Sequence, residues 1–334
     1  MVLLSVLDQS PIRSGGSGAD AIRETLLLAE AADRLGYHRY WLAEHHSSGG
    51  LAGSSPEVLI GQVAARTSRI RVGSGGVMLS HYSALKVAEN FRVLETLFPG
   101  RIDLGIGRAP GSDGRTARAL AHGPGALGLE HFPDRIAELL RFVHDDVEPD
   151  HPFAGVHAMP TGPTAPELWL LGSTAESASY AAYLGTAFSF AHFINSQGGA
   201  EVVRAYAASF RPSPYLPQPR ASIGVFVVCA ETDSEARRLA KSRDLFIARL
   251  YTGQLGPYPS VEEAEAHLYT EHELAIIQHA RPRSIVGTPE AVKDRLLALG
   301  AEYGIDEYVV VTITHDFGAR FRSYELLARA FGLS

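Results

Sequence analysis

The chain has 334 residues, and its 46% hydrophobic and 20% charged residues provide a sizeable core and exclude a disordered or fibrous protein. Its net charge of −7 argues against a nucleic-acid partner, which requires a concentrated basic surface. The single cysteine, Cys229, excludes an intramolecular disulfide and a cysteine-based zinc site, and it suits a cytoplasmic protein.

The first half of the chain alternates short apolar runs with amphipathic segments. Asp8 breaks the apolar start early, so no signal peptide is expected, and no later run approaches the ~20 residues that span a membrane. Strands are predicted at 3–8, 40–43, 70–73 continued by 77–79, and 102–107. Helices are predicted at 21–35, 56–65, 84–97 and, after a long glycine-rich loop at 109–130, at 132–146.

The second half repeats the same alternation. Strands are predicted at 168–172, 187–190, 223–229 and 307–311. Helices are predicted at 176–184, 201–210, 234–249, from 288 onward, and at 317–331. Residues 251–283 are rich in Gly, Pro, His and Tyr, and we expect an irregular insertion or lid there.

Strands that alternate with helices imply a parallel sheet, and eight such units favour a single (β/α)₈ TIM barrel over residues 1–334. An open doubly wound sheet is the alternative. It is weakened because no G-x-G-x-x-G follows the first strand, where a dinucleotide would bind.

The second predicted strand ends in three ionisable residues, Glu44, His45 and His46. A solvated loop is one interpretation, and a metal site is another. Adjacent side chains on an extended backbone point to opposite faces, so the two histidines are poorly placed to chelate one ion. We therefore expect no metal here and favour an acid/base or hydrogen-bonding role.

Two further strand ends suggest a phosphate ligand. Arg108 follows the fourth strand, where it forms either a rim ion pair or a fork of donors for a phosphate. An apolar strand then leads through Gly172 into Ser173, Thr174 and Ser177 at a helix start. One hydroxyl would suit a simple helix cap, whereas three beside a glycine favour a phosphate bound at the helix N-terminus.

Four segments together resemble the bacterial luciferase-like monooxygenase family. They are Trp41-Leu42-Ala43-Glu44-His45-His46, Val72-Gly73-Ser74-Gly75-Gly76-Val77, Gly100-Arg101-Ile102-Asp103-Leu104-Gly105-Ile106-Gly107-Arg108 and Leu171-Gly172-Ser173-Thr174-Ala175-Glu176-Ser177-Ala178. A fifth match, Val286-Gly287-Thr288-Pro289-Glu290, precedes the last helix before the final strand. The segments occur in family order over essentially the whole chain.

The resemblance implies the luciferase-like variant of the barrel, with an insertion in the C-terminal third and FMN at the carboxyl-terminal mouth. Gly75-Gly76 would form a non-prolyl cis peptide beside the flavin ring, with Glu44 near it. His45 would be the catalytic histidine. The phosphate would be held by Arg108, Ser173, Thr174 and Ser177.

The implied activity is a two-component monooxygenase, in which a flavin reductase supplies reduced FMN and dioxygen oxygenates a small organic substrate. By position, the substrate-pocket candidates are Gln9, His81, Phe190 and His192. Gly107 replaces the reactive cysteine of true luciferase, and Phe190-Ala191-His192 replaces a Trp-containing segment, which argues against light emission and a long-chain aldehyde. The resemblance also implies a homodimer built on helices that flank the second and third strands.

Three other functions remain open at this point. One is hydride transfer with a deazaflavin, on the same barrel. Another is a metal-dependent hydrolase that uses Glu44, His45, His46 and His81. The third is flavin binding without catalysis.

Overall fold

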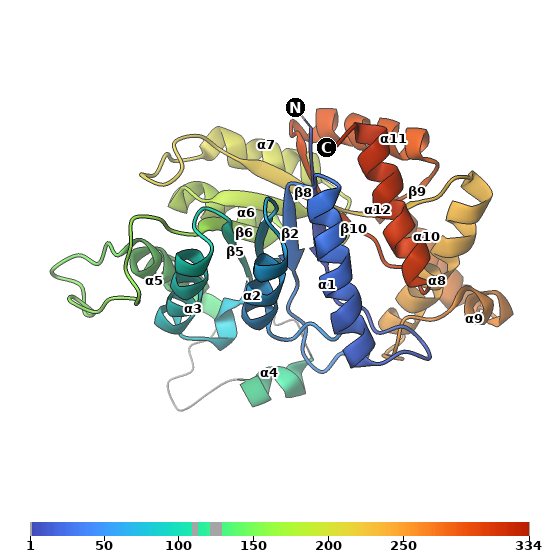
Figure 1. Ribbon diagram of the computed structural model, residues 1–334, viewed down its shortest axis with the longest axis horizontal. Coiled ribbons are helices and arrows are strands. Elements are labelled where there is room, and N and C mark those ends of the chain that lie inside the picture. Colours follow the sequence, from blue (N-terminus) through green and yellow to red (C-terminus); the bar gives the residue numbers. More distant parts are fainter. Residues whose placement is uncertain (1, 109–112, 121–128, 334) are drawn as a thin grey trace.

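The computed structural model describes residues 2–108, 113–120 and 129–333, and these form a closed parallel barrel surrounded by helices (Figure 1). β10 pairs with both β1 and β8, and this pairing closes the sheet. β3 and β4 share one position and β9 adds an outer strand beside β8, so eight positions form the barrel. The strands are β1 Leu3–Asp8, β2 Arg39–Leu42, β3 Arg71–Ser74, β4 Val77–Met78, β5 Ile102–Gly107, β6 Glu167–Gly172, β7 Ala187–Ala191, β8 Ala221–Cys229, β9 Ser284–Gly287 and β10 Glu307–Val311.

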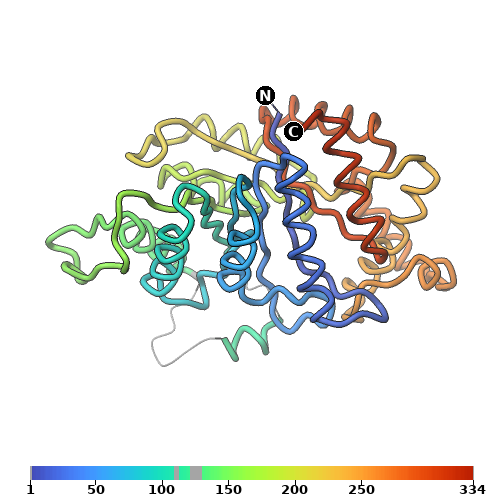
Figure 2. The backbone as a smooth tube through the Cα atoms, in the orientation of Figure 1, coloured from blue at the N-terminus to red at the C-terminus, as the bar shows by residue number. Residues whose placement is uncertain are grey.

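The helices lie outside the barrel, and the two chain ends lie close together where β1 and β10 begin (Figure 2). Among the described residues, no helix combines the length and apolarity needed to cross a membrane. The helices are α1 Gly18–Arg34, α2 Pro56–Arg66, α3 Ala84–Leu97, α4 Gly114–Leu120, α5 Phe132–His144, α6 Ala175–Leu184, α7 Gly199–Ser209, α8 Asp233–Tyr251, α9 Val261–Ala266, α10 Glu271–Ala280, α11 Pro289–Tyr303 and α12 Phe317–Phe331.

Strand alternation divides the apolar side chains into two clusters. In β8, Val225 and Val227 belong to the cluster packed between strands and helices, whereas Phe226 belongs to the cluster inside the barrel. Trp41 of β2 meets Trp169 of β6 at 5.2 Å between ring centroids. Since β2 and β6 are not neighbours in the sheet, this contact crosses the barrel interior.

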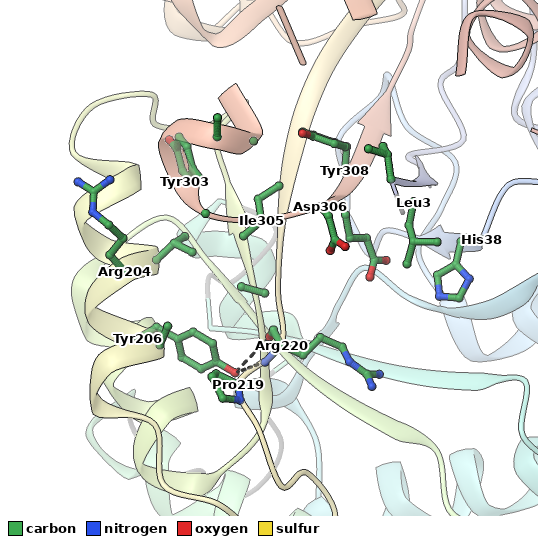
Figure 3. Close-up of a pocket in the computed structure, with 18 of the residues that line it drawn as sticks. Leu3, His38, Arg204, Tyr206, Pro219, Arg220, Tyr303, Ile305, Asp306 and Tyr308 are labelled. Carbon is green, nitrogen blue, oxygen red and sulfur yellow. Dashed lines mark hydrogen bonds between the residues drawn. The ribbon is translucent and has the colours of Figure 1, made fainter. Parts of the chain in front are cut away.

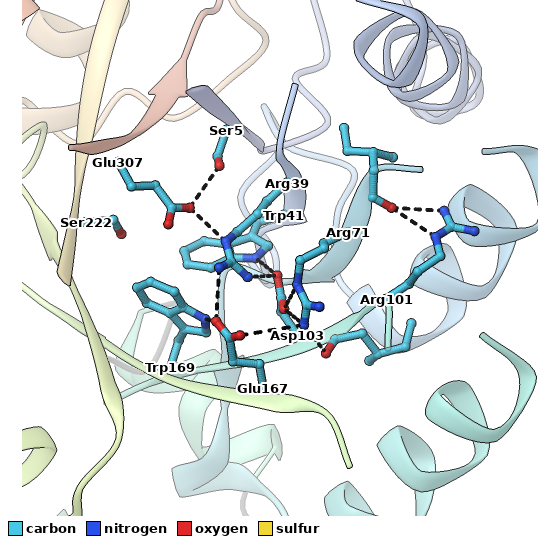
Figure 4. A network of polar contacts seen from close by, with 12 residues as sticks. Ser5, Arg39, Trp41, Arg71, Arg101, Asp103, Glu167, Trp169, Ser222 and Glu307 are labelled. Carbon is cyan, nitrogen blue, oxygen red and sulfur yellow. Dashed lines mark hydrogen bonds and ion pairs between the residues drawn. The ribbon is translucent and has the colours of Figure 1, made fainter. Parts of the chain in front are cut away.

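Charged residues fill the amino-terminal end of the barrel, where the strands begin (Figure 4). Arg39, only 2% exposed, forms ion pairs with Asp103 at 2.9 Å, Glu167 at 3.0 Å and Glu307 at 2.7 Å. Burial would raise the pKa of Glu167, but Arg39 and two further arginines lower it to about 2. Below this network an open hollow of about 1260 Å³ lies between the strand starts, α7 and the end of α11 (Figure 3).

The structure confirms the predicted barrel and corrects one segment. The expectation that 251–283 is irregular is wrong, because α9 and α10 form within it. Each of the two helices begins with a capping box, Ser260 with Glu263 and Thr270 with Glu273. The predicted loop at 109–130 lies outside the described residues at 109–112 and 121–128, and α4 forms between these two gaps.

Candidate active site

The carboxyl ends of the strands surround a first cavity of about 250 Å³. This is the end of a parallel barrel at which active sites form, because loops from several strands converge there. Most of the residues that the sequence singled out line this cavity, and they follow the ends of five strands. They are Gln9, Glu44, His45, Gly75, Gly76, Arg108, Ser173, Thr174 and Ser177.

Backbone without side chains forms one wall of the first cavity. The peptide between Gly75 and Gly76 is cis, which confirms that prediction. A Cβ atom on Gly76 would lie 2.7 Å from the backbone of Gly105 and 2.8 Å from Leu171, so the packing leaves no room for a side chain. The resulting bare surface allows a flat ligand to approach the backbone closely.

The amino end of α6 forms a second wall. Thr174 caps the helix by accepting a hydrogen bond from the Ser177 backbone, and Gly172 packs so closely on Ser177 that a Cβ atom would overlap it. The free N–H groups of a helix start and its dipole attract anions. Arg108 lines the same wall and forms an ion pair with Glu176 in the first turn.

Glu44 is buried at the cavity edge, and its hydrogen bonds hold the neighbouring segments together. Its carboxylate accepts hydrogen bonds from the Tyr82 hydroxyl at 2.6 Å, from His46 Nε2 at 2.7 Å and from the Met78 backbone at 3.0 Å. These contacts tie the end of β2 to β4 and to the turn that follows it. Burial, followed by the hydrogen bond to Glu44, raises the pKa of Tyr82, so its phenol stays protonated.

His45 lies next to Glu44 in the sequence, and its imidazole is neutral at pH 7. Its Nδ1 atom is buried and has no hydrogen-bond partner among the described residues. Burial, with a smaller contribution from His46, lowers the pKa of His45 to about 4. The backbone N–H of His45 donates to the Gly53 carbonyl at 2.8 Å, which fixes the start of the loop.

Three candidates for the substrate pocket lie elsewhere. Phe190 packs against Tyr303 at 6.0 Å between ring centroids, and His192 Nδ1 is 2.9 Å from the Tyr303 hydroxyl. His81 ends a short helical turn, with its ring 6.4 Å from that of His46. The alternation of side chains along β7 explains why Phe190 is absent from the cavity lining, because it turns Phe190 outward. The neighbours that line the first cavity instead are Ser189, Ala191, Phe193 and Ile194.

A second cavity of about 590 Å³ adjoins the first, and Gln9, His45, Phe193 and Ile194 line both. Its other walls include α8, residues 251–258 and side chains of β8 and β10, and its lining is mostly apolar. Sequence reasoning placed a possible lid at 251–283 but missed the α8 residues of this wall, because no local motif marks them. The pairing of Tyr258 with Ile12 and Ser14, distant in sequence, brings this wall to the barrel mouth.

The described residues contain no cluster of three or more His, Cys, Asp or Glu side chains that could hold a metal ion. A metal-dependent hydrolase would need Glu44 and His46 as ligands, but the two side chains are hydrogen-bonded to each other. The arrangement therefore offers an anion-binding helix start, a flat glycine wall and a neutral histidine around one cavity.

Comparison with known proteins identifies the family. The sequence profile of the luciferase-like monooxygenases matches residues 2–307, so the chain belongs to this family. YwcH of Bacillus subtilis (strain 168) is 51% identical over 332 residues, covering 99% of both chains. The N-acetyl-S-alkylcysteine monooxygenase of the same organism is 40% identical, covering 99% of this chain and 98% of its own. The chain is thus an oxidoreductase of the oxygen-incorporating class.

Solved structures agree on the fold. Apo-MsnO8 superposes with a TM-score of 0.91 at 41% identity, covering 100% of this chain and 99% of its own. At lower identity the fold alone is shared. The oxygenating constituent of 3,6-diketocamphane monooxygenase from Pseudomonas putida, in complex with FMN, has a TM-score of 0.71, and an F420-dependent secondary alcohol dehydrogenase has 0.68.

Proposed function

We propose that the chain is the oxygenating component of a two-component, FMN-dependent monooxygenase that accepts reduced FMN from a separate reductase. The observation that carries this proposal is the first cavity, which combines a flat glycine wall with an anion-binding helix start. Arg108, Ser173, Thr174 and Ser177 would hold the phosphate, and Gly75-Gly76 would face the ring.

Reduced FMN, when bound, would supply the electrons that activate dioxygen. The chain contributes positioning and exclusion of water, since Leu7, Trp41 and Leu171 give the first cavity apolar walls. His45 is neutral and can exchange one proton with the reacting groups. We assign this exchange to Nε2, because Nδ1 is shut off from solvent.

We propose that residues 251–283 act as a lid on the second cavity, whose wall they form in part. A homodimer built on the helices that flank β2 and β3 belongs to the same proposal. Exposed apolar side chains on α2 and α3 support it, since Val58 is 68% exposed and Leu97 is 63% exposed.

Fluorescence titration with FMN, reduced FMN and the deazaflavin F420 tests the cofactor. We expect FMN to bind, and Arg108→Met and Ser173→Ala to weaken it by about tenfold or more, since a hydrogen bond to a charged group contributes about 1.5–3 kcal/mol. Arg204→Met is the matched control, because Arg204 lies exposed on α7 and contacts Glu201. Lack of affinity for FMN in both redox states, or tighter binding of F420, would contradict the proposal.

Oxygenation is tested separately. The purified chain, a flavin reductase, NADH and a panel of organic substrates are incubated under isotopically labelled dioxygen. N-acetyl-S-alkylcysteines head the panel, since a relative that is 40% identical is named for them. One labelled oxygen atom per product molecule is the expected result, and loss of product in His45→Ala would support the role of His45.

A further inference from the structure

Arg243 is a buried cation that forms no ion pair with the described residues. It lies on α8, is only 5% exposed, and lines the second cavity. No ion pair or hydrogen bond of its guanidinium occurs within residues 2–108, 113–120 and 129–333, and the guanidinium carbon lies over the Phe226 ring, 4.6 Å from the ring centroid. A buried charge is costly unless it is paired, so this position is suited to an anion from outside the chain.

The acidic side chains around Arg243 are already engaged. The adjacent Asp244 pairs with Arg281 at 3.4 Å. Asp113, which also lines the second cavity, accepts hydrogen bonds from the first turn of α4, from the Arg115 backbone at 2.7 Å and the Thr116 backbone at 2.9 Å. Asp244 also attracts Arg243 electrostatically, but neither carboxylate forms an ion pair with it among the described residues.

The other two arginines of the second cavity each have a polar partner among the described residues. Arg249 lies 3.5 Å from Glu263, and Arg283 donates to the Tyr251 hydroxyl at 3.0 Å. Arg243 is thus the buried cation left to bind a ligand among the described residues of this wall.

A second polar group of the same wall also lacks a partner. The Tyr258 hydroxyl is buried, and no described residue hydrogen-bonds to it, although the Tyr258 ring stacks on Phe246 at 4.8 Å. The surrounding lining is apolar and includes Phe226, Val311 and Ile313. One fixed cation and one hydroxyl in an apolar chamber suit a monocarboxylate, which a guanidinium fork can bind through both oxygens.

We propose that the second cavity binds an organic substrate with one carboxylate and an apolar body, and that Arg243 and Tyr258 hold the carboxylate. Because His45 and Phe193 line both cavities, a ligand anchored at Arg243 extends toward the flavin cavity. The inference that this ligand is the substrate rests on the proposed function, whereas its binding at Arg243 does not.

Calorimetric titration without flavin tests the site with two probes of equal shape, 4-phenylbutanoate and its neutral amide 4-phenylbutanamide. We expect the wild type to bind the acid about tenfold or more tightly than the amide, as a charge-assisted pair requires. Arg243→Met should abolish this preference and Arg243→Lys should keep part of it. Tyr258→Phe should weaken acid binding severalfold.

Arg238→Met is the matched control. Arg238 lies exposed on the same helix and pairs with Glu235 at 2.8 Å, so its loss should leave the preference for the acid intact. FMN titration of every variant shows whether the first cavity is preserved. If Arg243→Met fails to fold, the acid–amide comparison in the wild type and in Arg243→Lys decides the question.

Equal affinity of the wild type for acid and amide, or no binding of either probe, would overturn the proposal. A preference that survives in folded Arg243→Met would do the same. FMN binding without a preference for the acid would refute the carboxylate site and leave the flavin function standing. A preference for the acid in a chain that binds no flavin would refute the flavin function alone.

Discussion

Neighbouring residues at the end of β2 have opposite surroundings. Glu44 points into a cage of three donors from Tyr82, His46 and Met78, whereas His45 lies in an apolar environment that offers its Nδ1 no partner among the described residues. Alternation of side chains along an extended backbone produces this difference. Glu44 therefore holds the loop in place, whereas the imidazole of His45 stays neutral and able to exchange a proton.

Burial of neutral His45 predicts a specific pH dependence of stability. Its pKa is about 4 in the folded chain and about 6.5 when unfolded, so the unfolded chain binds the proton first as the pH falls. Stability is therefore lost from about pH 6.5 down to about pH 4. Between pH 7 and pH 5, His45→Gln should lose about 2 kcal/mol less unfolding free energy than the wild type.

Urea unfolding at the two pH values measures this difference, and His272→Gln provides the control. His272 is exposed on α10, so its replacement should leave the pH dependence unchanged. Two other histidines, His38 and His144, are partly buried and also have a pKa of about 4, so His45→Gln should reduce the slope without abolishing it. An unchanged slope in His45→Gln would show that His45 is not held neutral.

At the scale of elements, two helical glycines show how packing decides the same substitution. A Cβ atom on Gly61, inside α2, would make an ordinary contact with Leu94 at 3.5 Å. A Cβ atom on Gly300, inside α11, would overlap the Tyr308 hydroxyl and lie 2.8 Å from its ring carbon. Gly61→Ala should thus raise the unfolding free energy by about 0.5–1 kcal/mol, because alanine favours helix.

Gly300→Ala should lower the unfolding free energy by about 1–3 kcal/mol, because the added methyl group overpacks the contact with Tyr308. Parallel thermal and urea unfolding of the two variants makes the comparison, with flavin affinity as a check that the barrel mouth is unaffected. Effects of the same sign would show that helix propensity, and not the space beside each glycine, governs these positions.

The sequence was informative where a local motif determines structure. The glycine-to-hydroxyl run at Gly172–Ser177 predicted the start of α6, and the capping boxes at Ser260 and Thr270 would have revealed α9 and α10. Contacts between distant segments were beyond its reach. In the sequence, Arg243 is one of many charged residues of a helix. The packing of α8 over the barrel mouth buries it, and it forms no ion pair with the described residues.

At the scale of the whole molecule, the two ends of the barrel differ in chemistry. At the carboxyl-terminal end, cavities are lined by polar groups that have no partner among the described residues, such as the Tyr258 hydroxyl. At the amino-terminal end, arginine and carboxylate side chains pair with one another. Arg39 joins carboxylates from β5, β6 and β10, so it connects strands from both halves of the chain. Figure 4 shows these groups meeting around one guanidinium. Loss of the Arg39 cation should therefore lower the stability of the whole barrel.

Arg39→Met should lower the unfolding free energy by about 3–5 kcal/mol at pH 7, because it leaves the buried Glu307 carboxylate without its cation. Burial and repulsion from Asp103 already raise the pKa of Glu307 above its ordinary value, and loss of Arg39 would raise it further. A raised carboxylate pKa gives stability that is present at low pH and lost as the pH rises, so the deficit should be smaller at pH 5 than at pH 7.

Urea unfolding of Arg39→Met at both pH values tests this sign, with Arg23→Met as the control, since Arg23 lies exposed on α1 beside Asp20. The control should cost little at either pH, because exposed ion pairs contribute about 0–1 kcal/mol. A deficit that grows on acidification would mean that Arg71, which pairs with Asp103, and Arg220, which pairs with Glu167, keep the cluster neutral without Arg39. The barrel would then depend on these two arginines at this end and not on Arg39.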